Sequence, residues 1–264
     1  MNQKSRPENQ INKNNKTDQI KILAINGSPL RKNTYSALRK IEDNFPDIDF
    51  EIIGLNEINL KQCRGCYQCI RLGHQHCPNI DDRDILIEKM NIADGIIFSS
   101  PVYVNFISSL MKGFMERLAF YSHRPHFFDK YAMVLSTCGM FGADKANKYM
   151  EGIFTTFGCN VVSSAELTFS TESKEEKEKN WKNTKNAVSV LLSRIGSGKK
   201  NKPSTRQLIN FHIFKEVSTI YPDQFTADYN FHKDLSDFYY DAEINPIKKI
   251  LIQRSVKSMI NKIR

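Results

Sequence analysis

Apolar segments of two kinds alternate along the first two thirds of the chain. Short runs that are typical of buried strands occur at 20–26, 48–55, 95–100, 131–137 and 159–167. Between them, segments with apolar residues at every third or fourth position predict helices at 34–45, 81–93, 108–121 and 143–157. Strands apolar on both faces that alternate with helices predict a parallel sheet covered by helices on both sides.

The number of predicted strands indicates which sheet this is. Five parallel strands fit the flavodoxin-like order better than a six-stranded dinucleotide-binding domain. The predicted fold class is therefore α/β, with a flavodoxin-like doubly wound five-stranded parallel sheet and a mainly helical C-terminal extension.

The two ends of the chain have different patterns. Residues 1–19 are polar and contain no apolar run or cleavage site, so we expect a disordered leader rather than a secretory or transit peptide. Residues 171–200 predict a charged helix that stops at Gly196, and aromatic residues cluster after Arg206. We expect 171–264 to form an extension that packs on the flavodoxin-like domain predicted at 20–170, or on a second subunit, because it is too apolar to be disordered.

Composition and charge limit the classes of function. The chain has 264 residues with 40% apolar content, enough for one main core, and no apolar run approaches the ~18–20 residues of a membrane span. With no export signal, we expect a cytoplasmic protein with reduced cysteines. The formal charge is +9, but residues 247–264 hold six Lys or Arg and no acid, so the excess does not indicate a nucleic-acid interface.

The basic tail has a helical pattern of its own. Asn245 is a candidate N-cap and Pro246 a candidate first helical residue. Apolar residues recur at helical spacing from Ile247 onward, with basic residues mostly elsewhere. Such a helix at 245–264 could make peripheral contact with an anionic membrane surface, or pack on the domain or on a second subunit.

Three loops follow predicted strands at the edge where such sheets bind ligands. The loop 27–34, GSPLRKNT, offers hydroxyls, an amide and a cation just before a helix N-terminus, which is typical of a phosphate site. It contains neither GxGxxG nor GxxxxGK[ST]. The loop 99–106, SSPVYVNF, offers an apolar platform for a planar ring, and the loop 136–142, STCGMFG, has two glycines that allow close backbone approach.

Together, the three loops resemble the NADPH-dependent FMN reductase branch of the flavodoxin-like superfamily, over residues 20–168. The resemblance implies FMN as cofactor, NAD(P)H as electron donor and a homo-oligomer. Carried over by position, the phosphate contacts would be Ser28, Arg31, Asn33 and Thr34. The ring contacts would be Pro101, Val102, Tyr103, Val104, Asn105 and Phe106, and the ring edge would meet Thr137, Gly139 and Gly142. Leu30 stands where the family has arginine, which leaves the roles of Leu30, Arg31 and Lys32 open.

Four cysteines lie close together in CRGCYQCIRLGHQHCP, residues 63–78, between the second strand and the second helix. The C-x2-C-x2-C-x7-C spacing lets three thiolates converge on one cubane while the fourth closes it, and the following proline is similar to the ferredoxin arrangement. A loop without metal and a zinc site that uses His74 or His76 are the alternatives.

Iron–sulfur flavoproteins of the same family resemble this pattern. The resemblance implies a four-iron, four-sulfur cluster ligated by Cys63, Cys66, Cys69 and Cys77. We expect Cys138 and Cys159 to be small core or loop residues. His123 and His126 follow the third helix, where they could reach a substrate or remain solvated.

The resemblance implies an FMN-dependent NAD(P)H oxidoreductase, and no catalytic acid, base or nucleophile is expected because the flavin supplies the chemistry. With a cluster, electrons would pass between FMN and the cysteine site toward a ferredoxin-like protein. Without one, a small-molecule acceptor such as a quinone, nitro or azo compound would meet the ring directly. A non-enzymatic flavin redox carrier or sensor is the alternative from another class.

Overall fold

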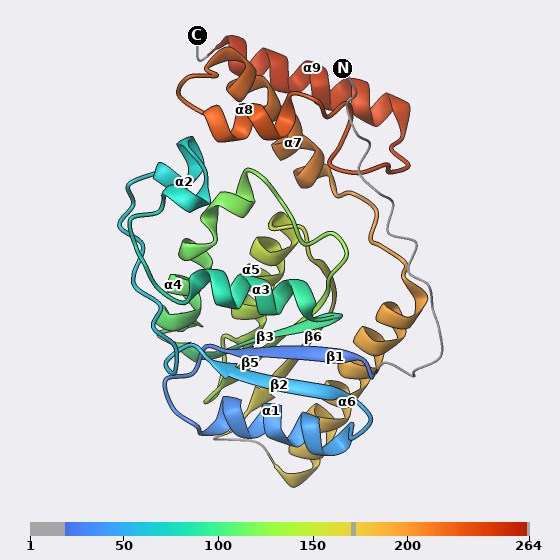
Figure 1. Cartoon of the computed structure of the whole chain (residues 1–264). Coiled ribbons are helices and arrows are strands. Elements are labelled where there is room, and N and C mark those ends of the chain that lie inside the picture. Colours follow the sequence, from blue (N-terminus) through green and yellow to red (C-terminus); the bar gives the residue numbers. More distant parts are fainter. Residues whose placement is uncertain (1–18, 170–172, 263–264) are drawn as a thin grey trace.

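A doubly wound parallel sheet forms the centre of the molecule (Figure 1). The computed structural model describes residues 19–169 and 173–262, so most of the predicted leader lies outside the described residues. The parallel strands follow the order β2-β1-β3-β5-β6. Their bounds are β1 Lys21–Asn26, β2 Asp49–Gly54, β3 Gly95–Tyr103, β5 Tyr131–Cys138 and β6 Asn160–Thr168. The short strand β4 (Phe106–Ile107) pairs antiparallel with the end of β3. The predicted fold class is confirmed.

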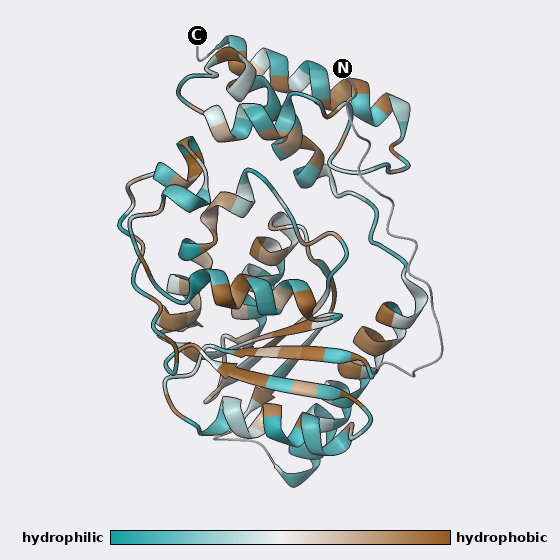
Figure 2. Cartoon of the chain, in the orientation of Figure 1, coloured by the Kyte–Doolittle hydropathy of each residue, from teal (hydrophilic) through white to brown (hydrophobic). Residues whose placement is uncertain are grey.

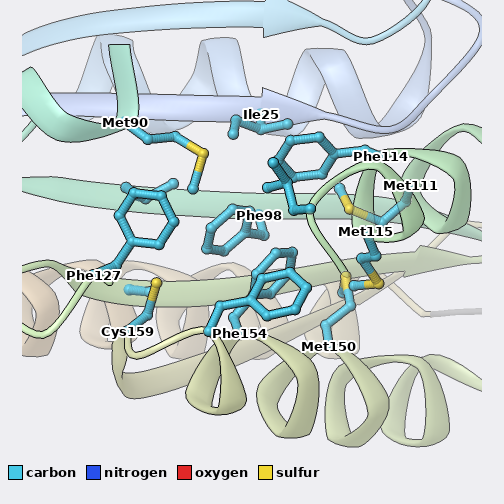
Figure 3. Packing of buried hydrophobic residues seen from close by; sticks show 14 of the residues in the cluster. Ile25, Met90, Phe98, Met111, Phe114, Met115, Phe127, Met150, Phe154 and Cys159 are labelled. Atoms are coloured by element: carbon cyan, nitrogen blue, oxygen red, sulfur yellow. The ribbon is translucent and has the colours of Figure 1, made fainter. Parts of the chain in front are cut away.

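Helices cover both faces of the sheet, and each face has its own core. Helices α3 (Arg83–Ile92), α4 (Ser109–Arg117) and α5 (Ala143–Thr156) lie on one face, and α1 (Asn33–Asn44) and α6 (Lys174–Ser197) on the other (Figure 1). The first core gathers aromatic and methionine side chains from β3, α4 and α5 around Phe98, which stacks on Phe154 (Figure 3). Because both faces are covered, the central strands are mostly hydrophobic along their length (Figure 2).

Two predicted helices have different bounds in the structure. The segment predicted at 108–121 is α4 followed by a 3-10 turn, Ala119–Ser122, rather than one helix. The helix predicted to stop at Gly196 continues to Ser197 and ends at Gly198, whose φ of 62° lies in the left-handed region. Glycine adopts that conformation without a steric penalty, so Gly198 rather than Gly196 ends the helix.

The C-terminal extension has a hydrophobic core of its own. Helices α7 (Thr205–Ile220), α8 (Thr226–His232) and α9 (Pro246–Asn261) lie beyond the α3 face of the sheet, and α8 contacts the short helix α2 (Gln68–Arg71) (Figure 1). The buried residues of this core are Leu208, Phe211, Phe238, Ile252 and Val256. The side chain of Asn245 accepts hydrogen bonds from the first N–H groups of α9, as the sequence predicts.

The loop after β1 is tied to β3 and α4 through Gly27. Its N–H donates to the carbonyl of Ser99 (2.8 Å), and its carbonyl accepts from the Ser108 hydroxyl (2.6 Å). A Cβ at position 27 would lie 2.9 Å from Cβ of Met111 and 3.0 Å from the Ser99 carbonyl oxygen. The close approach of three backbone segments therefore requires glycine here.

Helix α9 buries one face and exposes the other. Ile252 and Val256 face the extension's core, whereas Ile247, Ile250 and Leu251 are 70%, 48% and 61% exposed. No helix within residues 19–169 and 173–262 is long and apolar enough to cross a membrane. Membrane contact by 245–264 stays a prediction, and the structure narrows it to the face with these three aliphatic side chains.

We expect Gly27→Ala to lower the free energy of unfolding by roughly 1–3 kcal/mol, because the added methyl group forces the loop away from β3 and α4. Urea unfolding measures this change. Gly113→Ala is the matched control: a Cβ at Gly113 in α4 meets no other atom within 4 Å, so this variant should be as stable as the wild type or more so. Equal stability of both variants and the wild type would contradict the tight packing at Gly27.

For α9, we expect the double variant Ile247→Ser/Leu251→Ser to reduce pelleting with anionic lipid vesicles several-fold, since it removes apolar contact without opening the extension's core. Removal of 245–264 is a poorer test because it also uncovers that core. Ile85→Ser/Ile92→Ser is the matched control, since these aliphatic residues of α3 are 57% and 58% exposed. Unchanged pelleting of the α9 variant would overturn the membrane contact.

Candidate functional site

A pocket lies at the carboxyl ends of β1, β3 and β5, where the strand order reverses between β1 and β3. Its lining comes from all three loops that the sequence singles out. The predicted residues in the lining are Ser28, Asn33, Thr34, Pro101, Val102, Tyr103, Thr137 and Gly139. Leu30, Lys32 and Cys138 also line it. The sheet topology therefore brings together most of the residues predicted to contact FMN.

Buried hydroxyl groups hold the floor of this pocket. The Thr34 and Thr137 hydroxyls are hydrogen-bonded at 2.7 Å, and these residues are 1% and 3% exposed. The Ser28 hydroxyl donates to the carbonyl of Leu30 at 2.8 Å. Among the residues that the structure describes, no side chain caps the N-terminus of α1, whose residues Asn33 and Thr34 line the pocket. This end of α1 offers backbone N–H groups and a positive dipole end to an anion.

Arg31 does not line the pocket. Its guanidinium donates to the Glu57 carboxylate at 2.7 Å and lies over the Tyr35 ring. The pKa of Glu57 is lowered, because the Arg31 hydrogen bond outweighs the opposing effect of burial. The predicted phosphate contact at Arg31 would thus require its side chain to leave Glu57, whereas Lys32 already lies in the lining.

The turn between β3 and β4 stands at the rim. Val104 and Asn105 have φ angles of 50° and 61°, and Val104 is 98% exposed. A β-branched residue in this region is strained by ~1–3 kcal/mol. Gly142, at φ 96°, lies against the turn: a Cβ there would come within 3.1 Å of the Val102 side chain. The second and third loops therefore touch each other at the rim.

An apolar surface surrounds the mouth of the pocket. Tyr103, Phe106, Met140 and Phe141 are 47%, 40%, 63% and 66% exposed. The pocket has a volume of about 160 Å³, smaller than the ~300–1,000 Å³ of most ligand sites. These four side chains belong to the second and third loops, and their role as a platform for a flat ring stays a prediction.

The cysteine loop lies at the same edge of the sheet, between β2 and α3. It contains α2 and a 3-10 turn, His74–His76. Cys63 and Cys66 are exposed, and Cys69 and Cys77 are half-buried. Burial raises the pKa of the Cys69 thiol, and the charges of Cys77, Cys63 and Cys66 raise it further. The other three cysteines thus all favour the protonated form of the Cys69 thiol.

Two buried arginines lie beside Cys77. Arg117 donates to the Cys77 sulfur (3.0 Å) and to both carboxylate oxygens of Asp81 (2.7 and 2.8 Å). Arg83 donates to the backbone of His74. Burial raises the pKa of the Cys77 thiol, but the hydrogen bonds from Arg117 and Asn79 and the nearby arginine charges outweigh it, so the pKa is lowered. These arginines favour the thiolate form of Cys77.

The residue types of the cysteine loop can be compared with what a metal group requires. Within the described ranges 19–169 and 173–262, no group of three or more His, Cys, Asp or Glu side chains is arranged to hold a metal ion. Four thiolates are the ligands that a four-iron, four-sulfur cluster takes, so the residue types present fit such a group. His74 stacks on Phe120 instead, and burial lowers its pKa.

The remaining cysteine and histidine candidates have structural partners. Cys159 lies in the main core, as expected, whereas Cys138 contacts the Thr168 hydroxyl (3.5 Å) and also lines the pocket. His123 is hydrogen-bonded to the Asp228 carboxylate (2.7 Å), and His126 to the Asn91 side chain (2.9 Å). Neither histidine lines the pocket.

Sequence reasoning missed the buried arginines Arg83 and Arg117 and the partly buried Arg124. Arg83 and Arg117 lie in predicted helices, where a charged residue normally indicates the solvent face. The apolar residues that flank Arg117 in MKGFMERL were the one available signal that this position faces inward.

The chain is similar to known flavoproteins over the sheet domain. Residues 20–174 match the NADPH-dependent FMN reductase family. An iron-sulfur flavoprotein of Archaeoglobus fulgidus is 34% identical over 100 residues, which cover 37% of this chain and 48% of that protein. One of Methanocaldococcus jannaschii is 39% identical over 101 residues, covering 37% of this chain and 51% of that protein. The chain thus spans about half the length of these curated relatives.

A solved structure has the same fold over most of the chain. RosB, crystallised with bound 8-demethyl-8-formylriboflavin-5'-phosphate, is similar with a TM-score of 0.50 and 15% identity, over 86% of this chain and 92% of RosB. The likeness extends past the sheet domain but concerns the fold alone. Since the family match covers more than half of the residues, the chain belongs to the NADPH-dependent FMN reductase family.

Proposed function

We propose that this protein is an FMN-dependent NAD(P)H oxidoreductase in which electrons pass between FMN and an iron–sulfur cluster held by Cys63, Cys66, Cys69 and Cys77. The observation that carries this proposal is the contact between the loops in which the two sites lie. Asn56, in the loop after β2, donates to the carbonyl of Pro29 in the loop after β1 (3.1 Å), and Arg31 pairs with Glu57 across the same boundary. The segment that leads to the cysteines is therefore joined directly to the pocket.

The inner pocket suits the FMN phosphate. The open N-terminus of α1 and the Lys32 ammonium favour a dianion, and Asn33 adds an amide donor. The Thr34–Thr137 hydrogen bond fixes both hydroxyls before the ligand arrives, so binding does not have to order them.

The apolar platform suits the ring. Pro101 ends the buried part of β3 and directs the chain toward Tyr103, while Met140 and Phe141 stand on the opposite loop. When bound, FMN supplies hydride and single-electron chemistry, and the cluster supplies a one-electron site. The platform residues would position the ring and exclude water from one of its faces.

The cysteine loop suits a site that carries negative charge. Arg117 and Arg83 offset the charge of the thiolates near Cys77, and Lys112 lies near Cys63. Residues 58–80 contain three Lys or Arg and no Asp or Glu, so an acidic ferredoxin-like protein would be attracted to this surface.

Two alternative functions would use the same flavin site. The exposed platform could receive a quinone, nitro or azo compound directly, which would make the protein a reductase without a cluster. A non-enzymatic carrier or sensor would use the same flavin site without turnover. The experiments below separate these functions.

Protein purified without air should show flavin absorption with a broad additional shoulder, and iron and acid-labile sulfide should reach about four of each per chain. Cys69→Ser should remove most of the iron and sulfide while flavin remains. Cys159→Ala is the control, because Cys159 lies in the core and should not affect either assay. Flavin with neither iron nor sulfide in the wild type would overturn the cluster and leave the cluster-free reductase.

Enzymatic turnover is tested by NADH and NADPH oxidation with a generic quinone acceptor. We expect Thr34→Val to reduce bound FMN and the oxidation rate together by about tenfold, since it removes a buried hydroxyl that is hydrogen-bonded in the pocket floor. Thr219→Val, in α7, changes the same group where its hydroxyl bonds the Lys215 carbonyl, and should alter neither. Flavin-loaded protein that oxidises neither nucleotide would favour the carrier or sensor.

A further inference from the structure

A partly buried charged group, the Arg124 guanidinium, joins the C-terminal extension to the cysteine loop. Arg124, just after the 3-10 turn that follows α4, donates to the backbone carbonyls of Cys69 (2.5 Å) and Ile70 (3.0 Å). The same guanidinium forms an ion pair with Asp228 on α8. One side chain thus connects the third cysteine of the loop to a carboxylate of the extension.

Asp228 is held in place from several sides. It is 2% exposed, and its second carboxylate oxygen accepts from Nδ1 of His123 at 2.7 Å. Its backbone carbonyl lies 2.8 Å from Nδ1 of His232, which is fully buried. His123 in turn stacks on Phe214 of α7. The extension therefore presents Asp228 to Arg124 in a fixed position.

Helix α2, which carries Cys69, is held at the surface: Cys69 packs against the main core from outside, and the helix contacts the two neighbouring 3-10 turns. It is four residues long and contains no buried residue. So short a helix is not stable by itself, because the cost of starting a helix exceeds what one turn returns. A second polar bridge to the extension, from Arg71 to the Gln224 carbonyl (3.3 Å), supports the same helix. The position of Cys69 thus depends on groups outside its own loop.

We propose that Arg124 and Asp228 are positioning residues, through which the C-terminal extension holds helix α2, and with it Cys69, in a fixed place within the cysteine loop. The importance of this for a cluster rests on the proposed function, whereas the dependence of α2 on the extension does not. Buried ion pairs add little net stability, because desolvation offsets their attraction. The Arg124–Asp228 pair therefore acts by fixing the position of Cys69 rather than by stabilising the fold.

The test uses the full-length protein, reduced and free of iron, with iodoacetamide as the probe and peptide mass spectrometry to follow each cysteine. In the wild type, the exposed Cys63 and Cys66 should react faster than Cys69. The double variant Arg124→Met/Asp228→Asn removes both charges together, so neither is left buried without its partner. We expect it to raise the alkylation rate of Cys69 about tenfold, toward that of Cys66, because α2 is released.

Two controls separate local release from general unfolding. Cys159 is 2% exposed in the main core and should stay unreactive in every variant. Asp237→Asn breaks the Lys249–Asp237 ion pair (2.5 Å) inside the extension and should leave the rate at Cys69 unchanged. An unchanged rate at Cys69 in the double variant, or a parallel increase at Cys159, would overturn the proposal.

Protein that contains iron gives an independent readout. There, the double variant should release iron to a chelator several-fold faster than the wild type, and an equal release rate would count against the positioning role. If the wild type contains no iron, the cluster proposal fails, while alkylation of Cys69 still decides whether the extension holds α2.

Discussion

Strand β3 is covered on both faces and paired on both edges, and the positions of the ligand loops follow from this burial. Ile96, Ile97, Phe98, Ser99 and Ser100 are all 0% exposed. Two serines at the end of such a strand must find hydrogen-bond partners inside the protein. Ser99 donates to the β1 backbone at Ile25, and the hydroxyl of Ser100 accepts from the N–H of Ser108, where α4 begins. The two serines at the end of β3 thus hold the loop after β1 (27–34) and the loop after β3 (99–106) in place.

Three guanidinium groups organise the surroundings of the cysteines. Arg117 contacts the Cys77 thiol and the Asp81 carboxylate. Arg83 contacts the His74 carbonyl and the Asp84 carboxylate. Arg124 contacts two backbone carbonyls of α2 and the Asp228 carboxylate. Arginine suits these positions because its fork of donors can serve several acceptors at once. Although two of the cysteines are exposed, the arginines restrain the loop that carries them.

The sheet, its helices and the pocket could be predicted because they leave local patterns. Runs such as 95–100 indicate buried strands, and the topology of parallel sheets then places their loops at one edge. The details depend on pairs far apart in sequence, which periodicity cannot reveal. Arg31 faces Glu57 rather than the pocket, and Arg124 meets Asp228 across 104 positions. Helix α6 ends at Gly198 rather than Gly196 because Gly198 adopts the left-handed conformation, and the surrounding structure decides which glycine does so.

The link between α2 and α8 also has a consequence for biosynthesis. Arg71 and its partner Gln224 are 153 residues apart. At a translation rate of about 5–20 residues per second, the ribosome needs roughly 8–30 seconds to add the intervening chain. During this interval the sheet strands can already form, while helix α2 lacks its partners on the extension. The nascent protein therefore passes through a stage in which Cys69 is not yet restrained, and this stage ends only when Gln224 and Asp228 have been added.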